Sequence, residues 1–167
     1  MAVSTEDARS HEFANSVPDR DSVFFKFDDA EFARSHRRVC AVALYGGRVL
    51  DGFQFFYDDQ VPGYHRGGTG GSRTLFTLAA GEVITEVRGS TGTDPFASAY
   101  PTLGELTLVT NRGRKCSVGM GSGFSQQTPF CYRATPGCGI LALKGACFGV
   151  SDGLLVTGLQ VSLEAQA

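Results

Sequence analysis

Short apolar or alternating runs, separated by glycine turns, dominate the chain from Val39 onward. In one of these runs Phe53, Phe55 and Tyr57 occupy every second position, a period of two that is typical of a β-strand. Val, Thr, Phe and Tyr, which strands favour, are frequent in these runs. We expect strands at Val39–Leu44, Val49–Tyr57, Leu75–Leu78, Val83–Val87, Glu105–Thr110, Ile140–Leu143 and Leu154–Leu163. Strands at this spacing, with no convincing helix among them, indicate an all-β antiparallel sandwich, barrel or prism.

The N-terminal part differs, because charged and polar residues are concentrated there. We expect residues 1–21 to form a polar, flexible arm and residues 22–167 to form a single domain. The segment Asp28–Arg38 has a helical composition but is short, so it is either a helical turn or a solvated loop. The N-terminus shows no apolar core of a secretory signal, which makes the cytoplasm the expected location. An unconventional route of secretion stays open.

Composition and charge narrow the classes of partner. The net charge of −2 argues against a nucleic acid or an anionic membrane surface held by bulk electrostatics. No apolar run approaches the roughly 20 residues that cross a bilayer, so membrane insertion is not expected. The five cysteines form no C-x-x-C pair and no metal-ligand spacing, and their odd number favours reduced thiols packed as small apolar side chains. A Cys131–Cys138 bridge would require an oxidising compartment.

The chain also contains a weak internal repeat. Glycine-rich loops occur at Gly67–Gly71 (GGTGG) and at Gly119–Gly123 (GMGSG), about 50 residues apart, and strand–turn–strand units recur around them. Three such units indicate three-fold pseudo-symmetry.

An ordered set of segments resembles the jacalin-related lectins over residues 22–164. The segments are FDD (27–29), GGRVLDGFQFFY (46–57), HRGGTGG (65–71), LAAGEVITEVRG (78–89), LGELTLVTNRG (103–113), GMGSG (119–123), GILALKG (139–145) and DGLLVTGLQVSL (152–163). The resemblance implies a β-prism of three four-stranded antiparallel sheets, often dimeric. It also implies binding of mannose-, glucose- or galactose-type sugars without a metal or another cofactor.

The sugar site that this family most often uses is damaged in the sequence. It joins an N-terminal Gly-Gly loop to a G-x-x-x-D loop before the last strand. Here DSVFFK stands before Phe27 in place of the glycines, and SDGLL (151–155) puts Leu155 where the aspartate belongs. Asp152 is close but aligns to a different position. Since leucine cannot accept a hydrogen bond from a hydroxyl, we expect no sugar at this site.

A second pair of loops is intact and resembles the second site of banana-lectin-like, mannose-binding members. Gly47-Arg48-Val49-Leu50-Asp51 matches G-x-x-x-D, and the glycine loop at 67–71 follows one hairpin later. By this resemblance the Asp51 carboxylate would accept from two sugar hydroxyls, in charge-assisted hydrogen bonds. The N–H groups of Arg48 and Val49 would assist, and Gly67 and Gly68 would close the other side. The alternative is that both segments are ordinary structural turns.

Three arginines flank these loops, at positions 48, 66 and 73. They are either solvated surface residues or a patch for sulfated or carboxylated glycans.

Catalysis is not expected. The three histidines are scattered, and Ser151-Asp152 lacks a G-x-S-x-G context. The doublets Asp28–Asp29 and Asp58–Asp59 could be mistaken for paired catalytic carboxylates, but adjacent strand residues point to opposite faces, and we expect solvated strand ends there.

The sequence therefore predicts a metal-independent lectin that binds glycans or glycoproteins, with a homodimer as the expected assembly. Mannose or glucose is favoured over galactose, because galactose-binding members are commonly cleaved to expose an N-terminal glycine that this chain lacks. The alternative function is a protein-interaction module on a lectin scaffold that has lost sugar binding.

Overall fold

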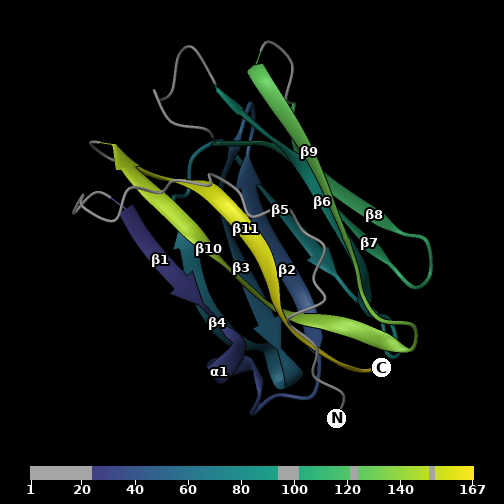
Figure 1. Cartoon of the computed structure of the whole chain (residues 1–167). Coiled ribbons are helices and arrows are strands. Elements are labelled where there is room, and N and C mark those ends of the chain that lie inside the picture. The colour runs from purple at the N-terminus through teal and green to yellow at the C-terminus, as the bar shows by residue number, and fades with distance from the viewer. Residues whose placement is uncertain (1–23, 94–101, 121–123, 151–152) are drawn as a thin grey trace.

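Three antiparallel sheets surround a common interior in the computed structural model, as Figure 1 shows. The structure describes residues 24–93, 102–120, 124–150 and 153–167. The expected N-terminal arm at 1–21 lies outside these residues. An all-β prism is thus confirmed, and each sheet contains strands that are close together in the sequence, with the N-terminal strand β1 as the exception.

The first complete sheet has the strand order β4-β3-β2-β5. Its strands are β2 (Val39–Gly46), β3 (Leu50–Tyr57), β4 (Val61–Gly67) and β5 (Ser72–Thr77), and the 3-10 turn η1 (Asp58–Gln60) joins β3 to β4. Phe53, Phe55 and Tyr57 are buried while Gln54 and Phe56 between them are half-buried. The period of two in the sequence therefore separates the core face of β3 from its outer face.

The second complete sheet repeats this pattern with the order β8-β7-β6-β9. Its strands are β6 (Ile84–Thr93), β7 (Thr102–Thr110), β8 (Lys115–Gly119) and β9 (Ser125–Arg133). Replacing β2, β3, β4 and β5 by β6, β7, β8 and β9 turns one order into the other, which is the structural form of the internal repeat.

The third sheet has three strands within the described residues, where the resemblance predicts four. The order is β1-β10-β11, with β1 (Phe24–Asp28), β10 (Cys138–Val150) and β11 (Gly153–Gln166). By the symmetry of the other sheets, β1 corresponds to β5 and a fourth strand would pair with the free edge of β11. The described residues contain no fourth strand of this sheet.

A helical turn, α1 (Ala30–Ala33), follows β1 and settles one of the two alternatives for the Asp28–Arg38 segment. The helix is a single short turn. At its start, the Asp28 side chain accepts a hydrogen bond from the Ala30 N–H at 3.0 Å. Ala30 and Ala33 are buried, and the turn packs against β10 and β11.

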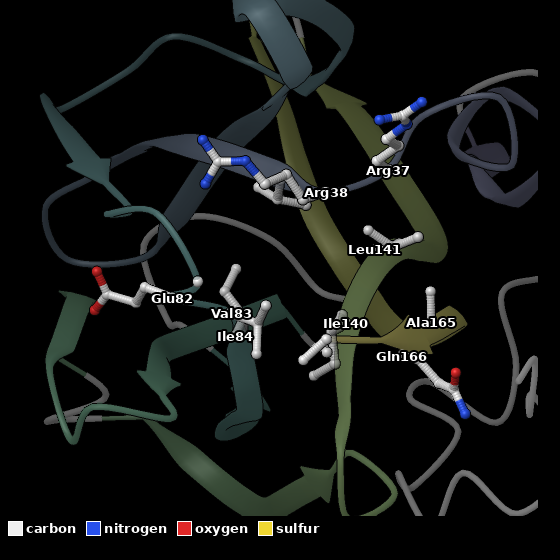
Figure 2. Close-up of a pocket in the computed structure, with 13 residues that line it drawn as sticks. Arg37, Arg38, Glu82, Val83, Ile84, Ile140, Leu141, Ala165 and Gln166 are labelled. Atoms are coloured by element: carbon white, nitrogen blue, oxygen red, sulfur yellow. The ribbon is translucent and has the colours of Figure 1, made fainter. Parts of the chain in front are cut away.

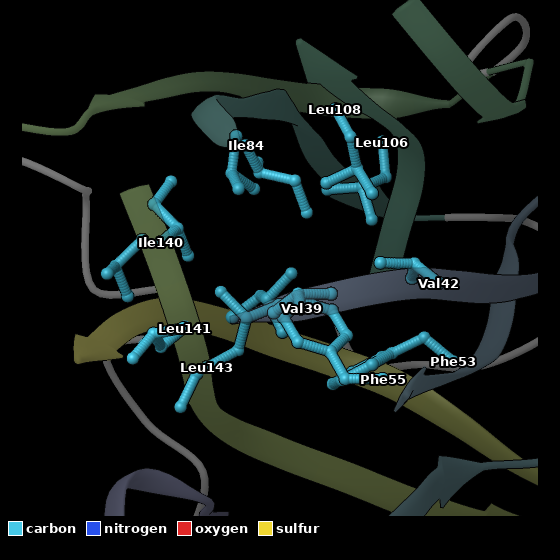
Figure 3. Close-up of a cluster of buried hydrophobic side chains, with 14 of the residues drawn as sticks. Val39, Val42, Phe53, Phe55, Ile84, Leu106, Leu108, Ile140, Leu141 and Leu143 are labelled. Carbon is cyan, nitrogen blue, oxygen red and sulfur yellow. The ribbon is translucent and has the colours of Figure 1, made fainter. Parts of the chain in front are cut away.

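The core lies between the three sheets, and Figure 3 shows the side chains from all of them pointing toward one another. Val39, Val42, Phe53 and Phe55 come from the first complete sheet, Ile84, Leu106 and Leu108 from the second, and Ile140, Leu141 and Leu143 from β10. All five cysteines lie in the described parts of the chain and none is in a disulfide; three of them are buried as expected, whereas Cys131 is exposed.

Candidate functional site

The two loops singled out in the sequence lie side by side at one end of the first complete sheet. One of them joins β2 to β3, and the other, the glycine loop (Gly67–Gly71), joins β4 to β5. Strand pairing brings them together, because Gly52 pairs with Gly67 across β3 and β4 while Gly46 pairs with Ser72 across β2 and β5. The loops are adjacent as a consequence of the strand order.

The Asp51 carboxylate faces the glycine loop. A Cβ atom built on Gly70 would lie only 2.8 Å from the Asp51 Oδ1, so the carboxylate rests against a backbone that carries no side chain. Asp51 is half-buried, and within the described residues its carboxylate contacts no hydrogen-bond donor and no cation. Burial raises the pKa of this carboxyl above its ordinary value. A desolvated carboxylate with free acceptor positions is suited to hydroxyl groups supplied by a ligand.

The Gly47–Asp51 loop is held by backbone hydrogen bonds on both sides. The Gly47 N–H donates to the Val49 carbonyl at 3.2 Å, and the Met120 N–H, at the end of β8, donates to the Arg48 carbonyl at 3.2 Å. In the part of the chain that the structure describes, the Val49 N–H has no hydrogen-bond partner. These two hydrogen bonds hold the loop in place, and the Gly47 N–H is already used within it.

Gly68 is fixed from two directions. Its N–H donates to the Asp51 carbonyl at 2.8 Å, and its carbonyl lies 3.0 Å from the His65 Nε2. Because a carbonyl can only accept, this Nε2 must carry the proton. The Gly68 N–H, which the resemblance would direct toward a sugar, is thus occupied within the protein.

Gly70 is the glycine that borders the Asp51 carboxylate, and the sequence did not distinguish it. The motif GGTGG contains four glycines, and only the strand register shows which of them lies beside the carboxylate. Gly67 and Gly71 have φ values of +82° and +68°, which explains their presence by backbone conformation. Gly70 has no such requirement, and its role is the close approach to Asp51.

An aromatic pair supports the glycine loop from the outer face of the sheet. The His65 ring lies edge-on to the Tyr45 ring with centroids 5.1 Å apart, and the Tyr45 hydroxyl accepts a hydrogen bond from the Arg73 Nε at 3.2 Å. These contacts join β4, β2 and β5 beside the loop.

Arg66, one of the three flanking arginines, is structural. Its guanidinium binds the Asp29 carboxylate through Nε at 3.2 Å and Nη2 at 2.5 Å, and it lies over the Phe27 ring at 5.0 Å. Both side chains are little exposed, that of Arg66 at 14% and that of Asp29 at 10%. The expectation of a solvated Asp28–Asp29 end is therefore wrong for Asp29, because the carboxylate is needed to pair with a buried cation. Arg48 and Arg73 remain exposed.

The second doublet joins two segments instead of standing free in solvent. The Asp58 carboxylate accepts from the Arg37 backbone N–H at 2.7 Å and lies 3.7 Å from the Arg38 Nε. The side chain of Asp59 lies outside the described residues.

Part of the family's more common site also lies outside the described residues, namely Ser151, Asp152 and the side chain of Leu155. The backbone of Leu155 belongs to β11 and pairs with Phe148. On the N-terminal side, Phe24–Asp28 forms strand β1, so the chain is extended just before Phe27.

Among the described residues, no three side chains of His, Cys, Asp or Glu converge as metal ligands. His36 stacks on Tyr57 at 4.9 Å and His65 binds Gly68, so each has a packing partner and neither is paired with a nucleophile. Within these same ranges, no helix has the length and apolar character to cross a membrane.

Comparison with known proteins identifies the architecture. The model of the jacalin-like lectin domain matches residues 25–151. A jacalin structure in complex with melibiose (galactose-α1,6-glucose) is 26% identical, with a TM-score of 0.62, over 84% of this chain and 98% of that one. The mannose-binding lectin from Champedak is 22% identical, with a TM-score of 0.63, over 83% of this chain and 87% of that one. Artocarpin in complex with methyl-α-mannose is 21% identical, with a TM-score of 0.64, over 84% of this chain and 89% of that one. No curated protein matches the sequence significantly.

Proposed function

Since this chain belongs to the jacalin-like lectin family, we propose that it binds carbohydrate through the paired loops at Gly47–Asp51 and Gly67–Gly71. The observation that carries the proposal is the Asp51 carboxylate, which is half-buried, lies against Gly70 and has no partner among the described residues. A protein rarely leaves a desolvated carboxylate without a donor, because that arrangement costs stability. A ligand rich in hydroxyls would supply the missing donors.

The loop geometry gives each group a role. The ionised Asp51 carboxylate accepts from two neighbouring hydroxyls, and the free N–H of Val49 donates to a sugar oxygen. Gly70 allows the ligand and the backbone to come close, as a side chain there would meet the carboxylate. No metal is required, since the carboxylate and the backbone supply both acceptors and donors.

Mannose or glucose is the sugar class that we propose. Support comes from the position of the intact loops, which resembles the second site of mannose-binding members. The solved relatives include complexes with galactose-containing and with mannose-type sugars, so they leave the class open. Inhibition of glycan binding by methyl-α-mannoside but not by methyl-α-galactoside would support the proposal, and the reverse pattern would overturn it.

The direct test compares the full chain with Asp51→Asn on a multivalent glycan array and in titration calorimetry. The substitution keeps the size of the side chain but removes the charge and replaces one acceptor oxygen by a donor. Hydrogen bonds to charged groups contribute about 1.5–3 kcal/mol, so affinity should fall at least about ten-fold. Glu105→Gln, an exposed carboxylate on β7, is the matched control and should bind normally.

The array also decides between the two functional classes. A lectin with one shallow site is expected to bind a monosaccharide with a Kd on the order of 0.1–10 mM and branched glycans more tightly through avidity. If the full chain bound no neutral or acidic glycan, the interaction-module alternative would replace the lectin. We propose a dimer as the source of avidity, to be measured by light scattering coupled to size-exclusion chromatography.

A further inference from the structure

Glu164, near the end of β11, is a buried carboxyl group without a cation to balance its charge. Its side chain is only 1% exposed. Its Oε2 accepts a hydrogen bond from the Thr135 N–H at 3.1 Å, whereas its buried Oε1 has no hydrogen-bond partner among the described residues. A buried carboxyl group with an unsatisfied oxygen costs stability, and the cost is greatest when the group is ionised. The surroundings therefore favour the neutral form of Glu164.

The charged groups of the neighbouring segments do not reach this carboxyl group. In strand register Glu164 pairs with Ile140 of β10, and the turn at 134–137, which follows β9, contains no titratable residue. Arg133 ends β9, but its Nε binds the Glu86 carboxylate of β6 at 3.1 Å. Within the part of the chain that the structure describes, no Lys, Arg or His lies within ion-pair distance of Glu164.

The balance of burial and hydrogen bonding at Glu164 points in the same direction. Burial raises the pKa of the Glu164 carboxyl above its ordinary value of 4.5, and the hydrogen bond from Thr135 offsets only part of that rise. On β10, the titratable residues Cys138 and Lys144 pair with other positions of β11. The folded chain therefore holds this proton more tightly than a solvated glutamate would.

Glu82 shows the contrasting arrangement of a buried glutamate. It is also fully buried, but it accepts hydrogen bonds from the Ala79 N–H at 2.9 Å, the Thr110 hydroxyl at 2.8 Å and the Arg114 Nη1 at 2.7 Å. These hydrogen bonds, that from Ala79 above all, lower the pKa of the Glu82 carboxyl in spite of its burial. Burial alone does not set the protonation of a glutamate in this fold, and Glu164 differs in what surrounds it.

Glu164 holds the end of β11 against the turn that joins the second complete sheet to the third sheet. A second hydrogen bond at this end runs from the Ala167 N–H to the Gly137 carbonyl at 2.9 Å. The same strand end borders a cavity of about 160 Å³, in whose wall Figure 2 shows Ala165 and Gln166. A strand end beside a cavity has fewer packing contacts to keep it closed, so it opens at a lower cost than the whole fold.

We propose that Glu164 is a proton-dependent latch for this end of the prism. With the proton bound, the neutral carboxyl group stays buried against the turn at 134–137. Loss of the proton puts an unbalanced charge in the interior, and opening of the strand end and the turn relieves it by admitting water. Local opening becomes more frequent as the pH rises, and proton binding closes the end again. The latch does not depend on the proposed sugar site.

Amide hydrogen exchange at Thr135 and Ala167, followed by NMR in the full chain between about pH 4 and pH 8, measures this opening. After correction for intrinsic exchange, the opening constant should be level below the ordinary pKa of 4.5, where Glu164 is protonated in both states. It should rise above that pH, by at most about ten-fold per pH unit, and level off above the raised pKa. An opening constant that is the same at every pH would overturn the proposal.

Carbon NMR of the side-chain carboxyl groups tests the protonation itself in the same chain. Glu164 should titrate with a higher midpoint than Glu105, an exposed glutamate on β7. A midpoint of Glu164 at or below that of Glu105 would also overturn the proposal.

Glu164→Gln keeps an acceptor for the Thr135 N–H but cannot ionise. In this variant, exchange at Thr135 and Ala167 should lose its pH dependence and stay near the slow level that the parent reaches at acid pH. Glu105→Gln removes an exposed carboxylate and is the matched control, which should keep the pH dependence of the parent. A folded Glu164→Gln that kept this dependence would contradict the latch. If the variant does not fold, the exchange profile and the carboxyl titration of the parent decide.

Discussion

Asp51 shows at the level of a single residue how a group proposed for binding can lower the stability of the fold. Burial raises its pKa above the ordinary value of 3.8, so the folded chain binds this proton more tightly than the unfolded chain does. The resulting loss of unfolding free energy is fully present above the raised pKa of Asp51, and it disappears as the pH falls below 3.8. The proposed sugar binding needs the ionised form of Asp51, and it should weaken on acidification at a higher pH than it would with an ordinary aspartate.

Asp51→Asn should therefore stabilise the protein at pH 7 while it weakens the proposed sugar binding. The gain in free energy of unfolding is expected to stay below about 1 kcal/mol, because solvent screens a half-exposed carboxylate. The difference between the variant and the parent should shrink as the pH falls toward 3.8. Urea unfolding at several pH values measures both effects. A variant that is less stable at pH 7 would show that Asp51 has a structural role.

His65 acts on the site through Gly68, as a positioning residue for the proposed lectin function. His65→Phe keeps a ring against Tyr45 but removes the N–H that holds the Gly68 carbonyl. One neutral hydrogen bond contributes about 0.5–1.5 kcal/mol, so glycan affinity should fall about three- to ten-fold. His65→Gln keeps an N–H donor and should restore most of the affinity. Amide exchange of Gly68 and Gly70 without sugar provides an independent readout, and it should be faster only in His65→Phe.

At the level of elements, the predicted strands correspond to β2, β3, β5, β6, β7, β10 and β11, whereas β1, β4, β8 and β9 and the details of the loops were not predicted. Alternation at Phe53, Phe55 and Tyr57 fixed the core face of β3, because side chains on a strand have a period of two. The choice of Gly70 over Gly68 depends on the register between β3 and β4, which no local pattern encodes. The burial of Asp29 could not be read from the sequence either, since its partner is 37 residues away.

The Arg66–Asp29 pair ties the segment between β1 and α1 to strand β4. Asp29→Ala would leave the Arg66 guanidinium buried without its anion, and it should cost about 2–4 kcal/mol of unfolding free energy. The double variant Arg66→Met/Asp29→Ala should cost less than the sum of the two single variants, because it leaves no unpaired charge. Chemical denaturation of the four proteins measures the coupling. Additive effects would show that the pair does not act as a unit.

At the level of the whole molecule, three similar units share one interior. The order β4-β3-β2-β5 recurs as β8-β7-β6-β9, as the weak repeat in the sequence predicts. The three-stranded third sheet departs from that symmetry within the described residues, and its β1 comes from the other end of the chain. Because β1 and β10 are far apart in sequence, closing this sheet joins the N-terminal and C-terminal parts into a single unit.

A shared core predicts cooperative unfolding, which two leucines can test. Leu108, on β7, is fully buried among side chains of all three sheets, whereas Leu75, on β5, is 49% exposed. Leu108→Ala should lower the free energy of unfolding by about 2–5 kcal/mol, and Leu75→Ala by less than about 1 kcal/mol. In Leu108→Ala, the slowest-exchanging amides of β3, β7 and β10 should all lose protection to a similar degree, because loosening one wall exposes the interior of the others. Accelerated exchange confined to the sheet of β7 would show instead that the three sheets unfold separately and that the prism is not a single cooperative unit.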